Sequence, residues 1–178
     1  MYQYNISFHD TMHTTKPTGA EIGNISNHLA ETQMDYRELA YAVGEAGCSF
    51  CPAVYHGKRK AENFKSQQLI GLDFDNGVPF HIIQQRAEHY HLKMLFAYRT
   101  FSDTAEHEKF RVVFALQHQI TDSFTARSVV SIFMKIFENC DEACKDSARL
   151  FFGGKGLLHL ASKPHEISLG EIILAFTA

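Results

Sequence analysis

The sequence has no long apolar run, few cysteines and no excess of positive charge. No stretch reaches the ~18 consecutive apolar residues of a membrane-spanning helix, and the opening residues 1–5 (MYQYN) do not begin a signal peptide. We therefore expect a cytoplasmic protein without a membrane partner. The chain has 178 residues, of which 45% are hydrophobic, enough to form the core of one ordinary domain spanning residues 1–178.

The formal net charge of −3 excludes one mode of nucleic-acid binding. Wrapping of DNA or RNA by bulk electrostatics needs a large basic excess, so any nucleic-acid contact in this protein must be local.

The four cysteines stand as two pairs, Cys48 with Cys51 and Cys140 with Cys144. These spacings are compatible with a zinc site if the two pairs meet in space. No third closely spaced element fixes such a pairing, and a chain of this size without a secretion signal keeps its thiols reduced. We therefore favour reduced, semi-buried cysteines over zinc.

An acidic strand end is the most informative stretch of the chain. Residues 69–77 read LIGLDFDNG: an apolar run enters two aspartates, and an Asn-Gly turn follows directly. Side chains alternate along a strand, so Asp73 and Asp75 are expected on one face, roughly 7 Å apart at ~3.3 Å per residue. Two carboxylates placed so need a cation or a basic group, and Mg²⁺ prefers oxygen ligands of this kind. The alternative is a solvated strand end before a hairpin turn.

The rest of the pattern predicts alternating helices and strands without repeats or linkers. The expected strands cover residues 2–8, 48–55, 94–100, 110–116 and 150–152, the expected helices cover 32–46, 79–90 and 122–138, and a turn is expected at 153–156. On the strand 110–116, Arg111 falls on the face opposite the phenylalanines.

A basic loop precedes the acidic strand. Residues 56–60 (HGKRK) carry three positive charges, from Lys58, Arg59 and Lys60. Such a run is most often a solvated loop. Its closeness to the acidic strand, together with Lys65, makes it a candidate for contact with a template strand or a triphosphate.

The polar residues Asp73, Asp75, Arg111, Asp141 and Arg149 together suit nucleotidyl transfer. That reaction needs carboxylates to hold two cations and basic side chains to hold the rest of a triphosphate.

The order LDFDNG, YRTFSDTAEHEKFRVVF and CDEACKDSARLFFGG resembles the catalytic core of the archaeo-eukaryotic primase superfamily, in particular the primase-polymerase-like replication proteins of plasmids, phages and integrated elements. The resemblance spans residues 45–156. The family's first motif, two acids separated by one residue, matches Asp73 and Asp75. Its third motif, an apolar residue and an aspartate followed about eight residues later by an arginine, matches Cys140-Asp141 with Arg149. The histidine of its second motif is replaced here by Arg111, which binds phosphate as a fixed cation but exchanges no proton near neutral pH.

The resemblance implies an α+β fold with an RNA-recognition-motif-like core, a mostly antiparallel sheet flanked by helices. It implies a template-directed nucleotidyltransferase, a DNA primase or DNA polymerase that acts on a single-stranded DNA template and primer with nucleoside triphosphates. Mg²⁺ or Mn²⁺ would be held by Asp73, Asp75 and Asp141. The nucleotide-binding residues expected on this basis are Arg111, Arg149, Lys109, Ser102, Thr104, Arg59 and Lys60. A replicative helicase or a helical accessory domain is a common companion of such cores, so the chain is either a stand-alone protein or the N-terminal part of a longer one.

Two other hypotheses stay open. The pair His89 and His91 has the His-x-His spacing of rolling-circle replication and relaxase nucleases, in which two histidines bind a metal and a tyrosine attacks DNA. Alternatively, the primase fold serves only to bind DNA or a helicase, and Arg111 keeps this hypothesis open. The three retained acids argue against it, because carboxylates without a cation are costly to bury.

Overall fold

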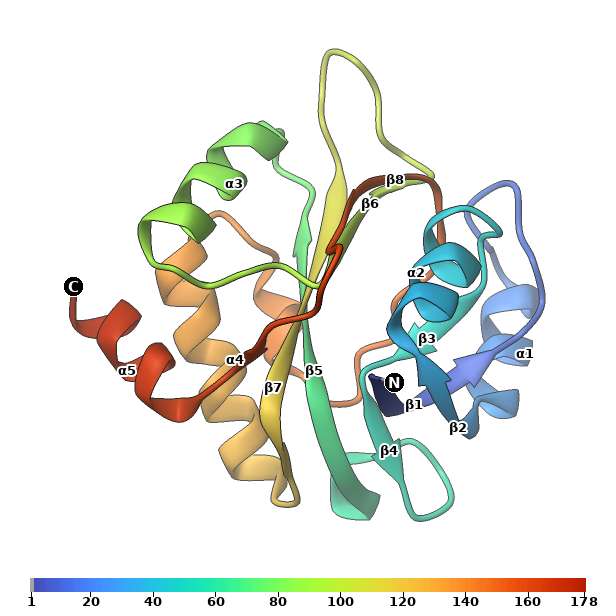
Figure 1. The fold of residues 1–178 in the computed structure, drawn as a ribbon. Coiled ribbons are helices and arrows are strands. Elements are labelled where there is room, and N and C mark those ends of the chain that lie inside the picture. Colours follow the sequence, from blue (N-terminus) through green and yellow to red (C-terminus); the bar gives the residue numbers. More distant parts are fainter. Residues whose placement is uncertain (1) are drawn as a thin grey trace.

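The computed structural model describes residues 2–178, which form two sheets with helices on both sides (Figure 1). The larger sheet is antiparallel except for its last strand, which pairs in parallel with β7. Its order is β4 (Ala53–Tyr55), β5 (Phe64–Phe74), β7 (Phe110–Ile120), β6 (Phe96–Thr100) and β8 (Gly154–Leu160), with β9 (Glu166–Ile167) beside β7.

One face of the larger sheet is covered by three helices, α3 (Phe80–His89), α4 (Ser123–Phe137) and α5 (Leu169–Thr177). Strand β7 turns Phe110, Val112 and Phe114 to this face, as its alternation predicts. The apolar stripe of α4 packs against these side chains, and Asp122 caps the helix by accepting a hydrogen bond from the Thr125 amide at 2.7 Å.

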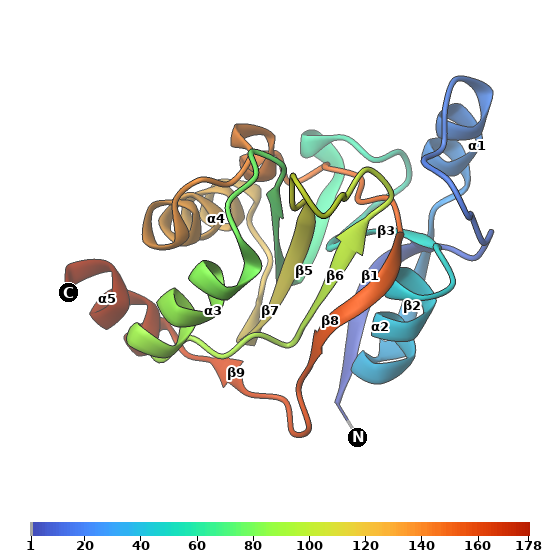
Figure 2. The ribbon, with the colours of Figure 1, turned by 90° about the horizontal axis from the view of Figure 1, so that it is seen from above.

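The opposite face is covered by the N-terminal part of the chain (Figure 2). A three-stranded antiparallel sheet forms in the order β2 (Ala30–Asp35), β1 (Gln3–His9) and β3 (Ser49–Cys51), accompanied by α1 (Ala20–His28) and α2 (Tyr36–Gly44). Buried side chains from this part, among them Ile6, Leu39 and Phe50, pack with Leu69 and Val113 of the larger sheet. Because side chains alternate along β5 and β7, each strand packs one face against the helices α3, α4 and α5 and the other face against the N-terminal part of the chain.

The fold confirms the predicted α+β class and most predicted elements, with two corrections. The helix expected over residues 32–46 begins only at Tyr36, because the residues before it pair with β1, Met34 lying opposite Tyr4. Asp35 then caps α2 by accepting a hydrogen bond from the Arg37 amide at 2.9 Å. Pairing with a neighbouring strand overrides the local helical periodicity here.

The second correction concerns residues 150–156. Phe151 forms only an isolated bridge to Phe50, and the expected glycine turn is instead the start of β8, where Gly154 lies opposite Thr100. A Cβ at Gly154 would lie 1.9 Å from the Arg99 carbonyl oxygen, so the glycine permits a close approach of two strands.

Two short 3₁₀ helices, η1 (Ala61–Asn63) and η2 (Glu142–Lys145), complete the fold. Among the helices formed by residues 2–178, none is long and apolar enough to cross a membrane.

Candidate active site

A cavity of about 250 Å³ lies at the ends of β5 and β7. Its wall contains most of the residues that the sequence singled out, although they come from distant parts of the chain. The lining residues are Lys16, Asp73, Asp75, Thr100, Phe101, Ser102, Lys109, Arg111, Asp141, Arg149, Leu150, Phe152 and Gly153. We refer to it below as the carboxylate cavity.

Asp73 lies at the centre of the cavity's charge network. It is opposite Arg111 in the β5–β7 register, and Arg111 Nε lies 3.1 Å from Asp73 Oδ1. Arg149 Nη2 lies 2.7 Å from Asp73 Oδ2. The Asp73 side chain is only 7% exposed, and two guanidinium groups offset the cost of burying its charge.

Asp141 is held next to Asp73 by the main chain. The Asp141 amide donates to the Asp73 carbonyl oxygen at 2.8 Å, and the Asp141 carboxylate accepts from the Ala143 amide at the start of η2. Arg149 Nη2 lies 2.8 Å from Asp141 Oδ2, so one nitrogen bridges two carboxylates. Burial alone would raise the pKa of Asp141, but the Ala143 amide and the Arg149 guanidinium hold that pKa below its ordinary value.

Cys144 forms a second link between the end of β5 and the η2 segment. Its Sγ accepts a hydrogen bond from the Asp73 amide at 3.2 Å, and the residue is buried. Burial raises the pKa of the Cys144 thiol to about 11, although Arg149 opposes the shift, so the sulfur stays protonated near neutral pH. The end of β5 and the η2 segment are thus joined by two hydrogen bonds that run in opposite directions.

One aromatic ring supports both arginines. The guanidinium carbons of Arg111 and Arg149 lie 5.4 Å and 5.5 Å from the Phe151 ring centroid. The ring itself rests on Gly71 and stacks on Phe50, with centroids 5.7 Å apart. The two cations are therefore positioned by cation–π contact as well as by the carboxylates.

The donor set of the cavity fits a hard divalent cation. Among residues 2–178, Asp73 Oδ1 and Arg111 Nε are buried without an aligned hydrogen bond, despite their short separation. Arg149 Nη2 lies between one oxygen of Asp73 and one oxygen of Asp141, and carboxylate oxygens are the ligands that Mg²⁺ prefers. Among residues 2–178 there is no group of three or more His, Cys, Asp or Glu side chains arranged to hold a metal ion.

The structure brings together some of the predicted nucleotide-binding residues and separates others. Ser102 and Lys109 line the carboxylate cavity with the three acids and two arginines. Thr104 lies outside it and closes a turn of the β6–β7 loop by accepting a hydrogen bond from the His107 amide.

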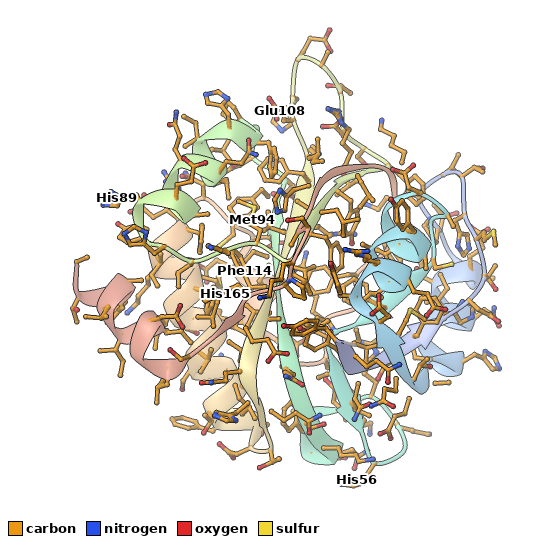
Figure 3. All side chains as sticks on the ribbon, in the orientation of Figure 1. His56, His89, Met94, Glu108, Phe114 and His165 are labelled. Carbon is orange, nitrogen blue, oxygen red and sulfur yellow. The ribbon has the colours of Figure 1, made fainter. Side chains whose placement is uncertain are left out.

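Arg59 and Lys60 line a different cavity. Figure 3 shows Glu108, in the β6–β7 loop, and His56, at the start of the basic loop, at opposite ends of the molecule. The basic loop is close to the acidic strand end in the sequence but not in space, because the 11 residues of β5 run from one to the other.

Lys16 is a charged residue of the cavity wall that is not among the site residues predicted from the sequence. It comes from the segment between β1 and α1 and lines the cavity together with Phe101 and Phe152. That segment has no periodic pattern, so nothing in the local sequence points to the sheet end that it reaches.

The histidine pair of the nuclease hypothesis lies at a helix end. His89 is the last residue of α3, and His91 follows in a turn with φ 58°. Figure 3 shows His89 on the helical side of the molecule. The two residues are therefore not strand neighbours that present imidazoles to one face.

The four cysteines are free thiols with separate surroundings. Cys48 contacts the Asp10 carbonyl oxygen, Cys51 the Ser147 carbonyl oxygen and Cys140 the Met134 carbonyl oxygen, whereas Cys144 serves the Asp73 amide.

Comparison with solved structures identifies the fold. The chain is similar to the AEP domain of the cyanophage S-2L primase-polymerase (PrimPol), with a TM-score of 0.55 over 98% of this chain and 88% of that domain. The sequences are 11% identical, so the likeness establishes the fold. Comparison with protein-family models and with curated proteins gives no match. The fold is that of the AEP domain of a primase-polymerase, as the resemblance in the order of the three motifs predicts.

Proposed function

We propose that this chain is a template-directed nucleotidyltransferase, a DNA primase or DNA polymerase that serves the replication of a plasmid, phage or integrated element. The observation that carries the proposal is the convergence of Asp73, Asp141, Arg111 and Arg149 in one cavity of a primase-polymerase fold. These residues come from two strands and a loop, and Arg111 and Arg149 are 38 and 76 positions from Asp73 in the sequence.

Mg²⁺ or Mn²⁺ would be held by Asp73, Asp75 and Asp141, the three carboxylates of the cavity. When bound, the metal ions neutralise charge on the phosphates and stabilise the attacking and leaving oxygens. Asp73 is shared with two guanidinium groups, whereas Asp75 is exposed. Release of Arg149 from its bridging position would free Asp141 Oδ2, would leave Asp73 Oδ2 with Arg111 as its one remaining partner, and would free the Arg149 guanidinium for phosphate.

The basic side chains would position the triphosphate. Arg149 and Lys109 are the cations that can turn toward phosphate, with Ser102 as a hydroxyl donor and Lys16 as a further cation of the cavity wall. Arg111 is held more firmly, because it also donates to the Phe152 carbonyl oxygen. The 3′-hydroxyl of a primer or first nucleotide would attack the α-phosphate and pyrophosphate would leave. The protein contributes positioning and charge neutralisation.

The proposal is tested by measuring incorporation of labelled nucleotides on a single-stranded DNA template, with Mg²⁺ or Mn²⁺ and with or without a primer. Wild type is expected to form product, and Asp75→Asn and Asp141→Asn are expected to lower its rate by at least about 100-fold. The matched control is Glu142→Gln, a neighbouring carboxylate that is 79% exposed and lies outside the cavity. Product formed equally well by all three variants would overturn the proposal.

The pairing of Arg111 with Asp73 favours one second candidate, a module that binds DNA or a helicase without catalysis. Tight binding of single-stranded DNA by a wild-type protein that gives no product with either metal would support it. A covalent link between a tyrosine and DNA would instead indicate the nuclease chemistry of His89 and His91.

A further inference from the structure

A second cavity, of about 530 Å³, lies beside the basic loop, away from the carboxylate cavity. It is enclosed by the end of α1, the start of β2, β4 and the loop that follows β4. The lining residues are Ser7, Ser26, Asn27, Leu29, Glu31, Val54, Tyr55, Gly57, Lys58, Arg59 and Lys60. We refer to it as the basic cavity.

Arg59 lines the basic cavity with a guanidinium that is only partly hydrogen-bonded. The side chain is half-buried, and its Nη2 donates to Ser26 Oγ at 2.7 Å. Its Nε is buried and has no hydrogen-bond partner among residues 2–178. A buried donor without a partner is costly, and such a group on a charged side chain in a cavity wall indicates an anionic acceptor that is supplied from outside.

The charges around the basic cavity favour an anion. Its one lining carboxylate, Glu31, is already paired with Lys65, whose Nζ lies 2.8 Å from Glu31 Oε2. Lys60 Nζ is 3.8 Å from Glu62, and both side chains are well exposed. Lys58 has no side-chain ion pair within the described part of the chain, so Lys58 and Arg59 provide positive charge that no carboxylate offsets.

We propose that the basic cavity binds the phosphodiester backbone of a single-stranded nucleic acid. A nucleoside triphosphate is a poorer fit, because it carries a divalent cation and the single carboxylate in the cavity wall, Glu31, is already paired with Lys65. The three cations also follow one another along a loop instead of converging on one point, which suits successive phosphates of a strand.

The basic cavity is linked to the carboxylate cavity by one hydrogen bond. Tyr55 lines the basic cavity, and its hydroxyl donates to the Ser147 carbonyl oxygen, two residues before Arg149. Along β5, Phe64 lies opposite Tyr55, and Asp73 is nine positions further, a span of ~30 Å at ~3.3 Å per residue. About nine nucleotides of a stacked strand, at ~3.4 Å each, cover that distance.

The identity of the strand as a template depends on the proposed function, whereas the binding itself does not. Equilibrium binding of fluorescein-labelled oligo(dT), of about 5 and about 15 nucleotides, is measured by anisotropy in EDTA without nucleotide. At about 0.1 M salt, Lys58→Gln and Arg59→Gln should each weaken binding of the longer oligonucleotide about fivefold and reduce the slope of log K against log[salt] by about 0.7. Arg59→Lys should keep most of the slope.

The matched control is Lys135→Gln, which removes a charge from α4 on the helical side of the sheet. Circular dichroism establishes that each variant is folded, and the exposed pair Lys58→Gln with Lys60→Gln replaces Arg59→Gln if that variant does not fold. Affinity and salt slope equal to those of Lys135→Gln would overturn the inference. Weakened binding of a labelled nucleoside triphosphate, with oligonucleotide binding unchanged, would overturn it as well.

The two proposals fail in different ways. Oligonucleotide binding that depends on Arg59, in a protein without extension activity, supports the strand site and refutes the polymerase. The opposite result is extension activity that is lost in Asp75→Asn but kept in Arg59→Gln, on short and long templates alike. Together with unchanged oligonucleotide binding by Arg59→Gln, it refutes the strand site alone.

Discussion

The two cavities differ in how their positive charges are compensated. In the carboxylate cavity, each of the two arginines contacts a carboxylate within 3.1 Å, and both rest on one aromatic ring. In the basic cavity, Arg59 has only a hydroxyl partner, and its Nε has none among the described residues. The first is an internally neutralised network, and the second is an uncompensated one.

This difference separates two kinds of binding. In a neutralised network a ligand has to compete with partners that are already in place: a metal ion would compete with a guanidinium, and a phosphate would compete with a carboxylate. Such a site is stable without ligand and gains little net charge on binding. An uncompensated site gains its missing partner from the ligand, so its affinity should depend strongly on salt.

The largest expected effect comes from removing the centre of the neutralised network. Asp73→Asn removes the negative charge that both Arg111 and Arg149 contact. Their side chains are only 12% and 16% exposed, so water compensates little for the loss. Breaking a buried pair in this way typically costs 3–5 kcal/mol, so we expect the free energy of unfolding to fall by about 3 kcal/mol. Urea unfolding followed by circular dichroism measures it.

Asp75→Asn is the control within the same cavity, because Asp75 is exposed and forms none of the network's ion pairs. Its free energy of unfolding should change by less than about 0.5 kcal/mol. Equal losses in the two variants would show that the network is not what stabilises this end of the sheet.

The second expected effect acts through the ring that supports both arginines. A Cβ at position 71 would lie 2.9 Å from two atoms of the Phe151 ring, and Phe151 is held by its stack on Phe50. Gly71→Ala should therefore destabilise the protein by about 1–3 kcal/mol, the usual cost of overpacking, and should lower extension activity by displacing the guanidinium groups. Thermal unfolding and the extension assay measure the two effects.

Gly23→Ala supplies the comparison, since a Cβ at Gly23, inside α1, meets nothing within 4 Å. That change should leave stability equal or slightly higher, by up to about 1 kcal/mol. A Gly71→Ala protein as stable and as active as Gly23→Ala would mean that the ring shifts freely and does not position the arginines.

A third, smaller effect is a pH dependence that arises in the carboxylate cavity. The pKa of Asp141 lies below its ordinary value, so its ionised form contributes stability above the ordinary range near pH ~4, and this contribution is lost as the pH falls through the lowered pKa. The difference in Tm between wild type and Asp141→Asn should thus be largest above pH ~5 and should vanish at lower pH. A difference that is constant with pH would contradict this assignment.

Local patterns and motif spacing in the sequence predict much of the carboxylate cavity. The alternation in residues 110–116 predicts that Arg111 faces away from the phenylalanines, and register places it opposite Asp73. The eight-residue spacing of Asp141 and Arg149 corresponds to a real contact. Strand alternation and turn chemistry act over short distances, so a single sequence reveals them.

Other features depend on contacts that no local pattern encodes. Residues 32–35 form a strand only because β1 lies beside them, and Gly154 starts β8 only because β6 approaches closely. Lys16 reaches the carboxylate cavity through an irregular segment. The short sequence distance predicts that Arg59 and Lys60 lie near Asp73, but the extended strand β5 places them at the other end of the sheet.

The smallest expected effect on stability belongs to the basic cavity. Arg59→Gln removes one hydrogen bond to Ser26 and at the same time removes an unpaired buried donor, and these two contributions oppose each other. The free energy of unfolding should change by less than about 0.5 kcal/mol, measured by urea unfolding beside Asp73→Asn. If it fell by as much as in Asp73→Asn, Arg59 would be a structural cation like Arg111, and the distinction between a neutralised and an uncompensated cavity would fail. A small change in stability, together with a lower salt slope of oligonucleotide binding, would instead mean that the charge of Arg59 serves a ligand and not the fold.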